Sequence, residues 1–499
     1  SLVTERLYYK ITDTVKMCYY HFMYWLRERI HPTWHFTAAL LGFVGGVALA
    51  LVWQIEPWLG YIAGSCLVLL ALWRARRMLL LAAIVGGLLI GIARGSASVN
   101  SLAEYASLYG QQVTLTGTIT DDTDAATQGT RIRLGAIYVQ GAALPGQVFA
   151  TVEDAQGARR SDRITVKGTV NTGFGSFAAT ITGAATRIER PVPGDVALEI
   201  RDTFARQVRS VIDEPQASLG IGYLLGQKSA LPAELVDALL ITGLTHIVVA
   251  SGYNLTILVR ASRRLFARVS KYLAMLSSVS LIVGFVAITG LSPSMSRAGL
   301  VAGLGIWAWY YGRKFHPLTL LSVAAAVTVA INPSYVWGDL GWLLSFAAFA
   351  GVMIVAPVAT AYFYGKEKVP FIAQLLVETV SAQITTLPIM IIAFEQFSII
   401  APLANVLILP LIPPTMLLVA LAGIAAWLPI GGEAVGWLAE RLLNVQLAVI
   451  NWCADIPWAL QEPKWSWWMA LGYCLAITLA VLYMKFRSGY KLYNASLVE

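Results

Sequence analysis

The sequence predicts a polytopic α-helical membrane protein with one inserted, extracytoplasmic small β-barrel. Of its 499 residues, 57% are hydrophobic and only 13% are charged, which excludes an ordinary soluble globular protein. Apolar runs long enough to cross a bilayer recur along the chain, and basic clusters lie beside many of them. Residues 94–192 break this pattern, because they are more polar and alternate with the period of β-strands.

The N-terminal part is expected to lie on the membrane and then to cross it. Residues 1–33 mix aromatic and basic side chains without a spanning apolar run, so we expect an amphipathic interfacial helix. Residues 34–93 should form three transmembrane helices, at 36–53, 58–73 and 78–93. The basic segment Arg74–Arg77 separates the second helix from the third, and the positive-inside rule places it in the cytoplasm. The N-terminus is therefore expected inside, and the region after the third helix outside.

Residues 94–192 are expected to form a closed β-barrel of OB type. Five short alternating segments predict its strands, at residues 112–120, 131–134, 147–152, 163–170 and 178–182. Such barrels bind single strands through stacking aromatics and basic grooves. The candidate DNA contacts are Arg131, Arg133, Arg159, Arg160, Arg163, Phe174 and Phe177. The region holds nine Lys or Arg and eight Asp or Glu, so a purely structural or assembly role stays open.

Residues 193–430 are expected to form a helical channel domain, and residues 431–499 an amphipathic segment followed by the last transmembrane helix. Helical periodicity at 195–212 predicts an interfacial helix that returns the chain to the membrane. Further spans are expected at 273–290, 297–312, 317–331, 341–361, 371–393 and 467–484. Prolines interrupt 398–428, which suggests a broken or re-entrant helix.

The apolar stretch from Gly243 to Arg260 carries His246, Ser251 and Asn254 in its middle. Polar groups at that depth are costly unless they face protein or a water-filled cavity, so they are a functional hypothesis. On one continuous helix they would share an arc of about 140° with Gly243. A break at Ser251-Gly252 would instead give two half-helices. Both alternatives place His246 and Asn254 inside the protein, and ordinary packing against neighbouring helices remains a third explanation.

Neither a metal site nor a cofactor is implied by the sequence. The four cysteines are far apart, and the five histidines form no recognisable metal-binding pattern. No GxxxxGK[ST] motif for nucleotide binding occurs. The net charge of +8 arises mostly beside apolar spans, where membrane orientation explains it, so the charge is weak evidence for DNA.

Five short blocks give the chain a family resemblance when they are taken in order. They are Leu224–Glu234, Gly243-Leu-Thr-His246 with Ser251-Gly252, Pro293–Ala298, Gly341–Phe346, and the stretch from Leu387 to Pro410. Together they resemble the ComEC-type competence proteins, which form the inner-membrane channel for transforming DNA. Asn254 and Leu343 depart from the His and Gln usual in that family. The chain shows no counterpart of the family's common C-terminal metallo-β-lactamase-like domain. Two explanations are open: the chain is a short natural form of the protein, or it is a piece of a longer one.

The resemblance implies a multi-pass protein of the cytoplasmic membrane that conducts single-stranded DNA during natural competence and is not itself an enzyme. Residues that would line or brace the path are His246, Ser251, Asn254, Ser294, Arg297, Ser345, Gln396 and Asn405. Arg297 is the best candidate for a phosphate contact. Alternatively, it reaches the membrane interface or pairs with Asp339 or Glu395. The implied partners are single-stranded DNA, membrane lipid, a DNA receptor outside, a motor ATPase or single-strand-binding protein inside, and a separate nuclease.

Two other functions remain open at this stage. Broken helices with polar residues near the membrane midplane are also typical of secondary transporters for a small solute or lipid. An intramembrane hydrolase using Ser251 and His246 is a second rival. Their separation of about 140° on a continuous helix disfavours it, unless a break brings the two side chains together.

Overall fold

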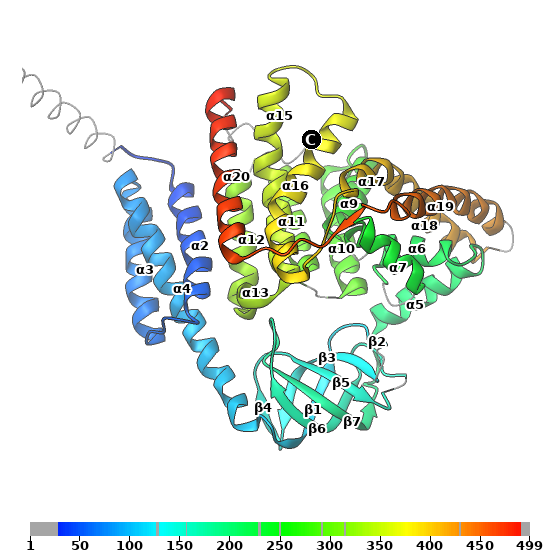
Figure 1. The fold of residues 1–499 in the computed structure, drawn as a ribbon, viewed down its shortest axis with the longest axis horizontal. Helices are drawn as coiled ribbons and strands as arrows, with labels where there is room; N and C mark the ends of the chain where they lie inside the picture. The colour runs from blue at the N-terminus through cyan, green and yellow to red at the C-terminus, as the bar shows by residue number, and fades with distance from the viewer. Residues whose placement is uncertain are drawn as a thin grey trace, which may run out of the picture. The chain divides into compact units, whose positions relative to one another are not determined.

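The computed structural model describes residues 28–125, 129–155, 157–227, 231–248, 251–290, 293–313, 316–428 and 431–490. Almost all of the interfacial helix expected at 1–33 therefore lies outside the described residues. The chain divides into two compact units, one of residues 1–101 with 322–337, and one of residues 102–321 with 338–499. Each unit is described by itself, with the element labels of Figure 1.

The first unit contains three long apolar helices, α2 (Pro32–Leu49), α3 (Pro57–Arg74) and α4 (Leu80–Leu102). Glycines allow α2 to approach α4 closely: a Cβ on Gly42 would collide with the carbonyl of Ile84, and one on Gly46 with that of Leu88. The short 3₁₀ segment η1 (Arg77–Leu79) precedes α4. The barrel was expected to begin at residue 94. Because α4 continues to Leu102, residues 94–102 are helical and do not belong to the barrel.

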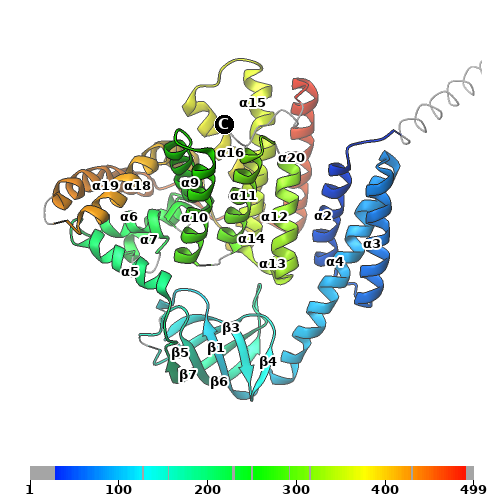
Figure 2. The same ribbon diagram turned by 180° about the vertical axis from the view of Figure 1, so that it is seen from behind.

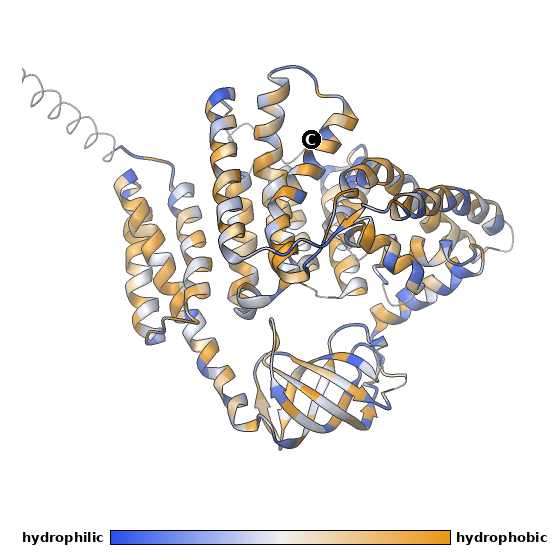
Figure 3. Ribbon diagram, viewed as in Figure 1, coloured by the Kyte–Doolittle hydropathy of each residue, from blue (hydrophilic) through white to orange (hydrophobic). Residues whose placement is uncertain are grey.

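Eight helices among the described residues are long and apolar enough to cross a membrane, and hydrophobic residues predominate along them (Figure 3). They are Pro32–Leu49, Pro57–Arg74, Arg77–Leu108, Lys271–Thr289, Leu340–Tyr364, Phe371–Phe394, Ala401–Ala425 and Trp467–Ser488. The prediction of a helix-rich chain with many such segments is confirmed. Two expected spans are not among the eight: 297–312 falls in α11 (Pro293–Tyr310), and 317–331 is α12 (Pro317–Ile331), which has only 15 residues.

The β-barrel is closed by five strands. They are β1 (Gln112–Ile119), β3 (Thr130–Val139), β5 (Val148–Glu153), β6 (Arg163–Thr172) and β7 (Ala179–Glu189). Around the barrel the order is β1-β3-β5-β7-β6 and back to β1, and only the β5–β7 pair is parallel. The predicted closed barrel of five strands is confirmed. Two short strands, β2 (Asp124–Ala125) and β4 (Ala142–Leu144), pair with β3, and the 3₁₀ segment η2 (Ala103–Leu108) precedes β1.

The barrel has its own core because alternate side chains of each strand point inward. In β3 the inward Ile132, Leu134 and Ile137 are at most 1% exposed. Leu115 of β1 and Ile181 of β7 complete the same cluster. This alternation is the pattern that the sequence showed.

The rest of the second unit is helical, and its core forms where α6 (Gln216–Leu225) packs with α18 (Ile412–Ala425) and α19 (Gly432–Ala454). Its other early helices are α5 (Val196–Arg209), α7 (Ala233–Ile241), α8 (Thr245–Val248), α9 (Gly252–Phe266) and α10 (Lys271–Thr289). Helices α9, α10 and α11 lie side by side, as both views show (Figures 1 and 2). The amphipathic helix expected at 195–212 is present as α5.

Two of the long apolar segments are irregular. In Leu340–Tyr364, α14 (Leu340–Ala350) passes through a π-helical turn, η4 (Gly351–Val355), into α15 (Ala356–Tyr364). In Ala401–Ala425, α17 (Ala401–Ile408) is followed by the 3₁₀ turn η5 (Leu409–Leu411) and α18. The expected interruption at the prolines therefore takes the form of a 3₁₀ turn.

The remaining helices in the described part of the chain are α13 (Ser334–Gly338), α16 (Phe371–Phe394) and α20 (Trp467–Ser488). A two-stranded sheet joins β8 (Phe397–Ser398) to β9 (Leu460–Gln461). This small sheet fixes the loop after α16, which contains part of the last motif block.

Candidate functional site

The central motif contains a break between two helices. Helix α8 ends at Val248 and α9 begins at Gly252, and Ser251 between them is extended, with φ −116° and ψ 155°. The Ser251 hydroxyl accepts a hydrogen bond from the Asn254 amide at 3.3 Å, so Ser251 is the N-cap of α9. An extended N-cap residue cannot continue a helix. The alternative of one continuous helix from Gly243 to Arg260 is therefore wrong, and the alternative of two half-helices is confirmed.

Asn254 joins three helices around this break. Its side chain is fully buried, and Nδ2 donates to the carbonyls of Tyr223 in α6 and Ile247 in α8, both at 3.0 Å. Its Oδ1 is buried and has no partner among the described residues. Asn254 thus lies inside the protein as expected and holds the two half-helices against α6.

His246 differs from the expectation, because its side chain is exposed. Its Nδ1 lies 2.9 Å from the Gly243 carbonyl, and since a carbonyl can only accept, Nδ1 carries the proton of this bond. Gly243 has a φ of 70°, and a Cβ there would lie 2.8 Å from Cβ of Ala401 in α17. Both the backbone conformation and the close approach of α17 require glycine at this position.

Arg297 of α11 lies beside the N-terminus of α9. Its Nη2 is 3.5 Å from the position that a Cβ on Gly252 would occupy. Its guanidinium carbon lies 5.8 Å and 5.4 Å from the ring centroids of Phe346 and Phe349 in α14, within the range of cation–π contacts. Its Nε is buried without a partner among the described residues.

The alternative ion pairs expected for Arg297 do not form between the described side chains. None of the salt bridges found within the described ranges includes Arg297. Asp339 instead caps α14 by accepting from the Trp342 amide at 2.7 Å, and it also accepts from the Ser176 hydroxyl at 3.1 Å. The guanidinium is thus held by aromatic rings and keeps donors for another ligand.

The other predicted path residues are distributed more widely. Asn405 is buried in α17, and its Oδ1 has no partner in the described part of the chain. Ser345 lies on α14, and Gln396 follows Glu395, the C-cap of α16. Among the described residues, no hydrogen bond joins Gln396 to the helix break. The side chain of Ser294 is outside the described part of the structure.

Buried polar atoms without partners concentrate in the motif blocks. In the described part of the larger unit, such side-chain atoms belong to Tyr105, Gln227, Asn254, Arg297, Ser398, Asn405 and Gln446. Gln227, Arg297, Ser398 and Asn405 lie in the five blocks, and Asn254 follows the second block by two residues. An unpaired buried polar group costs about 1–3 kcal/mol and is rare in native proteins. The blocks are therefore where water or a ligand would complete the structure.

Sequence reasoning missed three contributors to this region. Gln383 donates from Nε2 to the Ser398 carbonyl at 2.6 Å, and Phe349 contacts Arg297. Neither belongs to a motif block, so no local signal marked them. Gln227 lies inside the first block, and its position there was the signal that could have identified it.

A family model described as "Competence protein" matches residues 223–487, which is more than half of the chain. This chain belongs to the competence protein family. The matched range contains the helix break and all five motif blocks. It leaves out the barrel and helices α2 to α4.

Three curated proteins are similar to part of the chain. ComE operon protein 3 of Bacillus subtilis is 25% identical over 42% of this chain, and competence protein ComA of Neisseria gonorrhoeae is 26% identical over 51%. An uncharacterized protein of Aquifex aeolicus is 25% identical over 46%. The similarity covers 27%, 37% and 52% of these relatives, respectively. No solved structure matches the chain.

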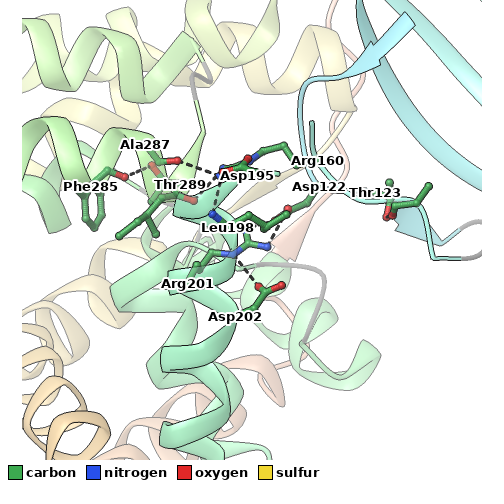
Figure 4. A network of polar contacts seen from close by, with 12 residues as sticks. Asp122, Thr123, Arg160, Asp195, Leu198, Arg201, Asp202, Phe285, Ala287 and Thr289 are labelled. Atoms are coloured by element: carbon green, nitrogen blue, oxygen red, sulfur yellow. Dashed lines mark hydrogen bonds and ion pairs between the residues drawn. The ribbon is translucent and has the colours of Figure 1, made fainter. Parts of the chain in front are cut away.

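In this competence-family chain, Arg160 anchors the barrel to the helical domain (Figure 4). Its Nε donates to Asp195 at 2.8 Å, and its Nη1 and Nη2 donate to the carbonyls of Ile288 at 2.9 Å and Ala287 at 3.1 Å. Arg160 is only 8% exposed. The end of α10 and Asp195 therefore occupy the guanidinium donors of Arg160, which was predicted as a DNA contact.

Asp195 and Arg201 extend this contact between barrel and helices. Asp195 caps α5 by accepting from the Leu198 amide at 3.0 Å, and it accepts from Ser161 at 2.9 Å. Burial opposes its ionisation, but the hydrogen bonds from Arg160, Leu198 and Ser161 outweigh burial and lower the pKa of Asp195. Arg201 of α5 donates twice to Asp122 of the barrel, at 2.7 Å and 3.0 Å.

The other candidate barrel contacts remain on the surface. Arg131, Arg159 and Arg163 are exposed, and Arg163 lies 5.6 Å from the ring centroid of Tyr138. Arg133 pairs with Asp121 at 2.8 Å. The rings of Phe149, Phe174 and Phe177 form a cluster with centroids 5.3–5.4 Å apart, and Phe174 is 55% exposed. The cluster joins β5, which carries Phe149, to the loop before β7, which carries Phe174 and Phe177, and it offers a surface on which bases can stack.

Proposed function

We propose that this chain conducts single-stranded DNA across the cytoplasmic membrane during natural transformation. Family membership supplies the context of DNA uptake, and the observation that carries the proposal is the helix break at Ser251. Motif blocks from α6, α11 and α17 approach this break, and buried polar atoms without partners gather in them. A polyanion in a membrane needs polar groups and fixed positive charge along its route.

Each path residue has a distinct proposed role. Arg297 is the phosphate contact, and its neighbours Phe346 and Phe349 hold the guanidinium in place. Exposed His246 lines the route, while Asn254 braces the break from behind. Asn405 presents an unpaired Oδ1 and supplies a polar wall on α17.

The barrel is proposed to stand at the extracytoplasmic end of this path. Its strand order, with one parallel pair between the third and fifth barrel strands, supports the OB type. The basic clusters at Arg74–Arg77 and Arg260–Lys271 support a cytoplasmic N-terminus and an external barrel. A DNA receptor outside, and a motor ATPase or single-strand-binding protein and a nuclease as separate partners, complete the proposal.

A hydrolytic role is not proposed, because no hydrogen bond joins the Ser251 hydroxyl to His246 among the described residues. The Ser251 hydroxyl accepts from the Asn254 amide, and His246 Nδ1 donates to the Gly243 carbonyl. Nucleophilic catalysis would require the histidine to accept the serine proton. The Ser251→Ala variant keeps the small side-chain volume and should therefore retain much of its DNA transport, whereas a serine hydrolase would lose nearly all activity.

The test is reconstitution of the full chain into liposomes with a labelled single strand outside. Uptake is measured as label that resists added nuclease, with protein-free liposomes as the control. We expect protected single strands for the wild type and for Ser251→Ala, and a large loss for Arg297→Ala. Uptake of small solutes without any protected DNA would favour a secondary transporter and contradict the proposal.

A further inference from the structure

We propose that the N-terminus of α9 and the Arg297 guanidinium together form a binding site for one phosphate group. The identity of the ligand as a phosphodiester of the passing strand rests on the proposed function, whereas anion binding itself does not. Helix α9 has 15 residues and a well-formed N-cap at Ser251. The positive end of such a helix and its free amides attract anions.

The first amides of α9 are available for a ligand. The Asn254 amide is used by the Ser251 hydroxyl, and the Leu255 amide donates to the Ser251 carbonyl. The amides of Gly252 and Tyr253 have no acceptor among the described residues. Two neighbouring N–H groups at the end of a helix thus remain for an anion.

Arg297 is an independent sign of a ligand at the same place. Its Nη2 lies 3.5 Å from the Cβ position of Gly252, while its Nε is buried and unpaired. The described residues provide it with no carboxylate, and the rings of Phe346 and Phe349 carry no negative charge to neutralise it. A guanidinium offers two parallel donors that match two phosphate oxygens.

Gly252 provides the space between the helix end and the guanidinium. A Cβ at this position would lie 3.1 Å from Cβ of Ala298 and 3.5 Å from Arg297 Nη2. Its φ lies outside the left-handed region, so alanine fits the backbone. Gly252→Ala therefore narrows the site without removing a charge, although Ala298 must shift by a few tenths of an ångström to admit the new Cβ.

A site of this kind suits conduction because it holds one phosphate at a time. A conducting path must bind its cargo well enough to admit it and weakly enough to release it. Two amides and one guanidinium bind a single phosphate, and the next phosphate of a strand can replace it. The geometry thus assigns Arg297 a positioning role at one point of the strand.

The test measures anion binding by the detergent-purified full chain, independently of transport. The probes are sodium phosphate and sodium chloride at matched ionic strength, and the readout is the midpoint of thermal unfolding. We expect phosphate to raise the midpoint of the wild type more than chloride does. The dissociation constant for phosphate should rise about tenfold to hundredfold in Arg297→Gln, as for loss of a charged hydrogen bond.

Variants separate the site from general effects. Arg297→Lys should bind phosphate with intermediate affinity, because the charge remains and the fork is lost. Gly252→Ala should bind more weakly than wild type. The controls are Gly303→Ala in α11, where a Cβ meets open space, and Arg268→Gln at an exposed position. Both controls should retain the phosphate effect.

Equal effects of phosphate and chloride in the wild type, or an undiminished phosphate effect in both Arg297 variants, would overturn the site. The liposome assay distinguishes this failure from failure of the proposed function. If Arg297→Gln blocks DNA uptake but still binds phosphate normally, the site is wrong and the channel stands. If it loses phosphate binding but conducts DNA normally, the site is real and the proposed path is wrong.

Discussion

Asn254 shows how one buried amide can position a break between two helices. Its two donors satisfy carbonyls in α6 and α8, so neither carbonyl needs water at that point. The family's usual histidine is absent at this position, yet the asparagine has a clear structural task. Its role is therefore that of a brace, and its unpaired Oδ1 is the only part of the side chain left for a ligand among the described contacts.

Replacing Asn254 by alanine should destabilise the chain by about 1–3 kcal/mol, because two buried carbonyls lose their donors. The measurement is thermal unfolding in detergent. Thr256→Val is the matched control, since among the described residues the Thr256 hydroxyl bonds only to the Gly252 carbonyl of its own helix. Unchanged stability of Asn254→Ala would show that water replaces the amide and that the brace is dispensable.

At the scale of elements, the regular parts of the fold were predictable from local patterns. Alternating residues marked β1 and β6, and apolar runs marked α3 and α16, because both signals arise from neighbours in the sequence. The junction of Figure 4 was not predictable, because Arg160 meets the end of α10 more than 120 residues away. The candidate site was found only as motif blocks; the phenyl contacts of Arg297 depend on tertiary packing.

The junction between barrel and helices should weaken in acid. The ionised Asp195 is stabilised in the folded chain, because its pKa is lowered there. This stabilisation is fully present above the ordinary pKa near 4 and is lost as the pH falls through the lowered value. As the pH falls below about 4, the wild type should therefore lose unfolding free energy more steeply than Asp195→Asn, in thermal unfolding measured over this acidic range. Parallel curves would contradict the assignment.

The barrel surface offers a second test at this scale. If bases stack on the phenylalanine cluster, Phe174→Ala should weaken single-strand binding by about 1–3 kcal/mol without changing the salt dependence. Removing the charges of exposed Arg131 and Arg159 should instead make the salt dependence shallower. Fluorescence anisotropy of a labelled oligonucleotide, titrated with the full chain at several salt concentrations, separates the two. Identical binding by all variants would favour a structural role for the barrel.

For the molecule as a whole, the orientation in the membrane is the prediction with the widest consequences. In a chain without its native cysteines, a cysteine at Ser107 should react with an impermeant thiol reagent in intact cells. Lys366 and Lys368 lie in the turn between α15 and α16, which the positive-inside rule places in the cytoplasm, so a cysteine at Lys366 should react only after lysis. Both positions are exposed, so accessibility of the side chain does not limit either reaction. The opposite labelling pattern would reverse the topology.

The small β8–β9 sheet also dictates when the site can be finished during synthesis. Ser398 pairs with Leu460, and the Ile399 amide donates to the Ala459 carbonyl at 2.8 Å, so a late segment completes the loop beside Gly243. At about 5–20 residues per second, the ribosome needs on the order of 3–12 s to pass from one strand to the other. During that interval the loop beside Gly243 has no strand partner. The helices that precede Phe397 are therefore made several seconds before the loop beside Gly243 can take its final form.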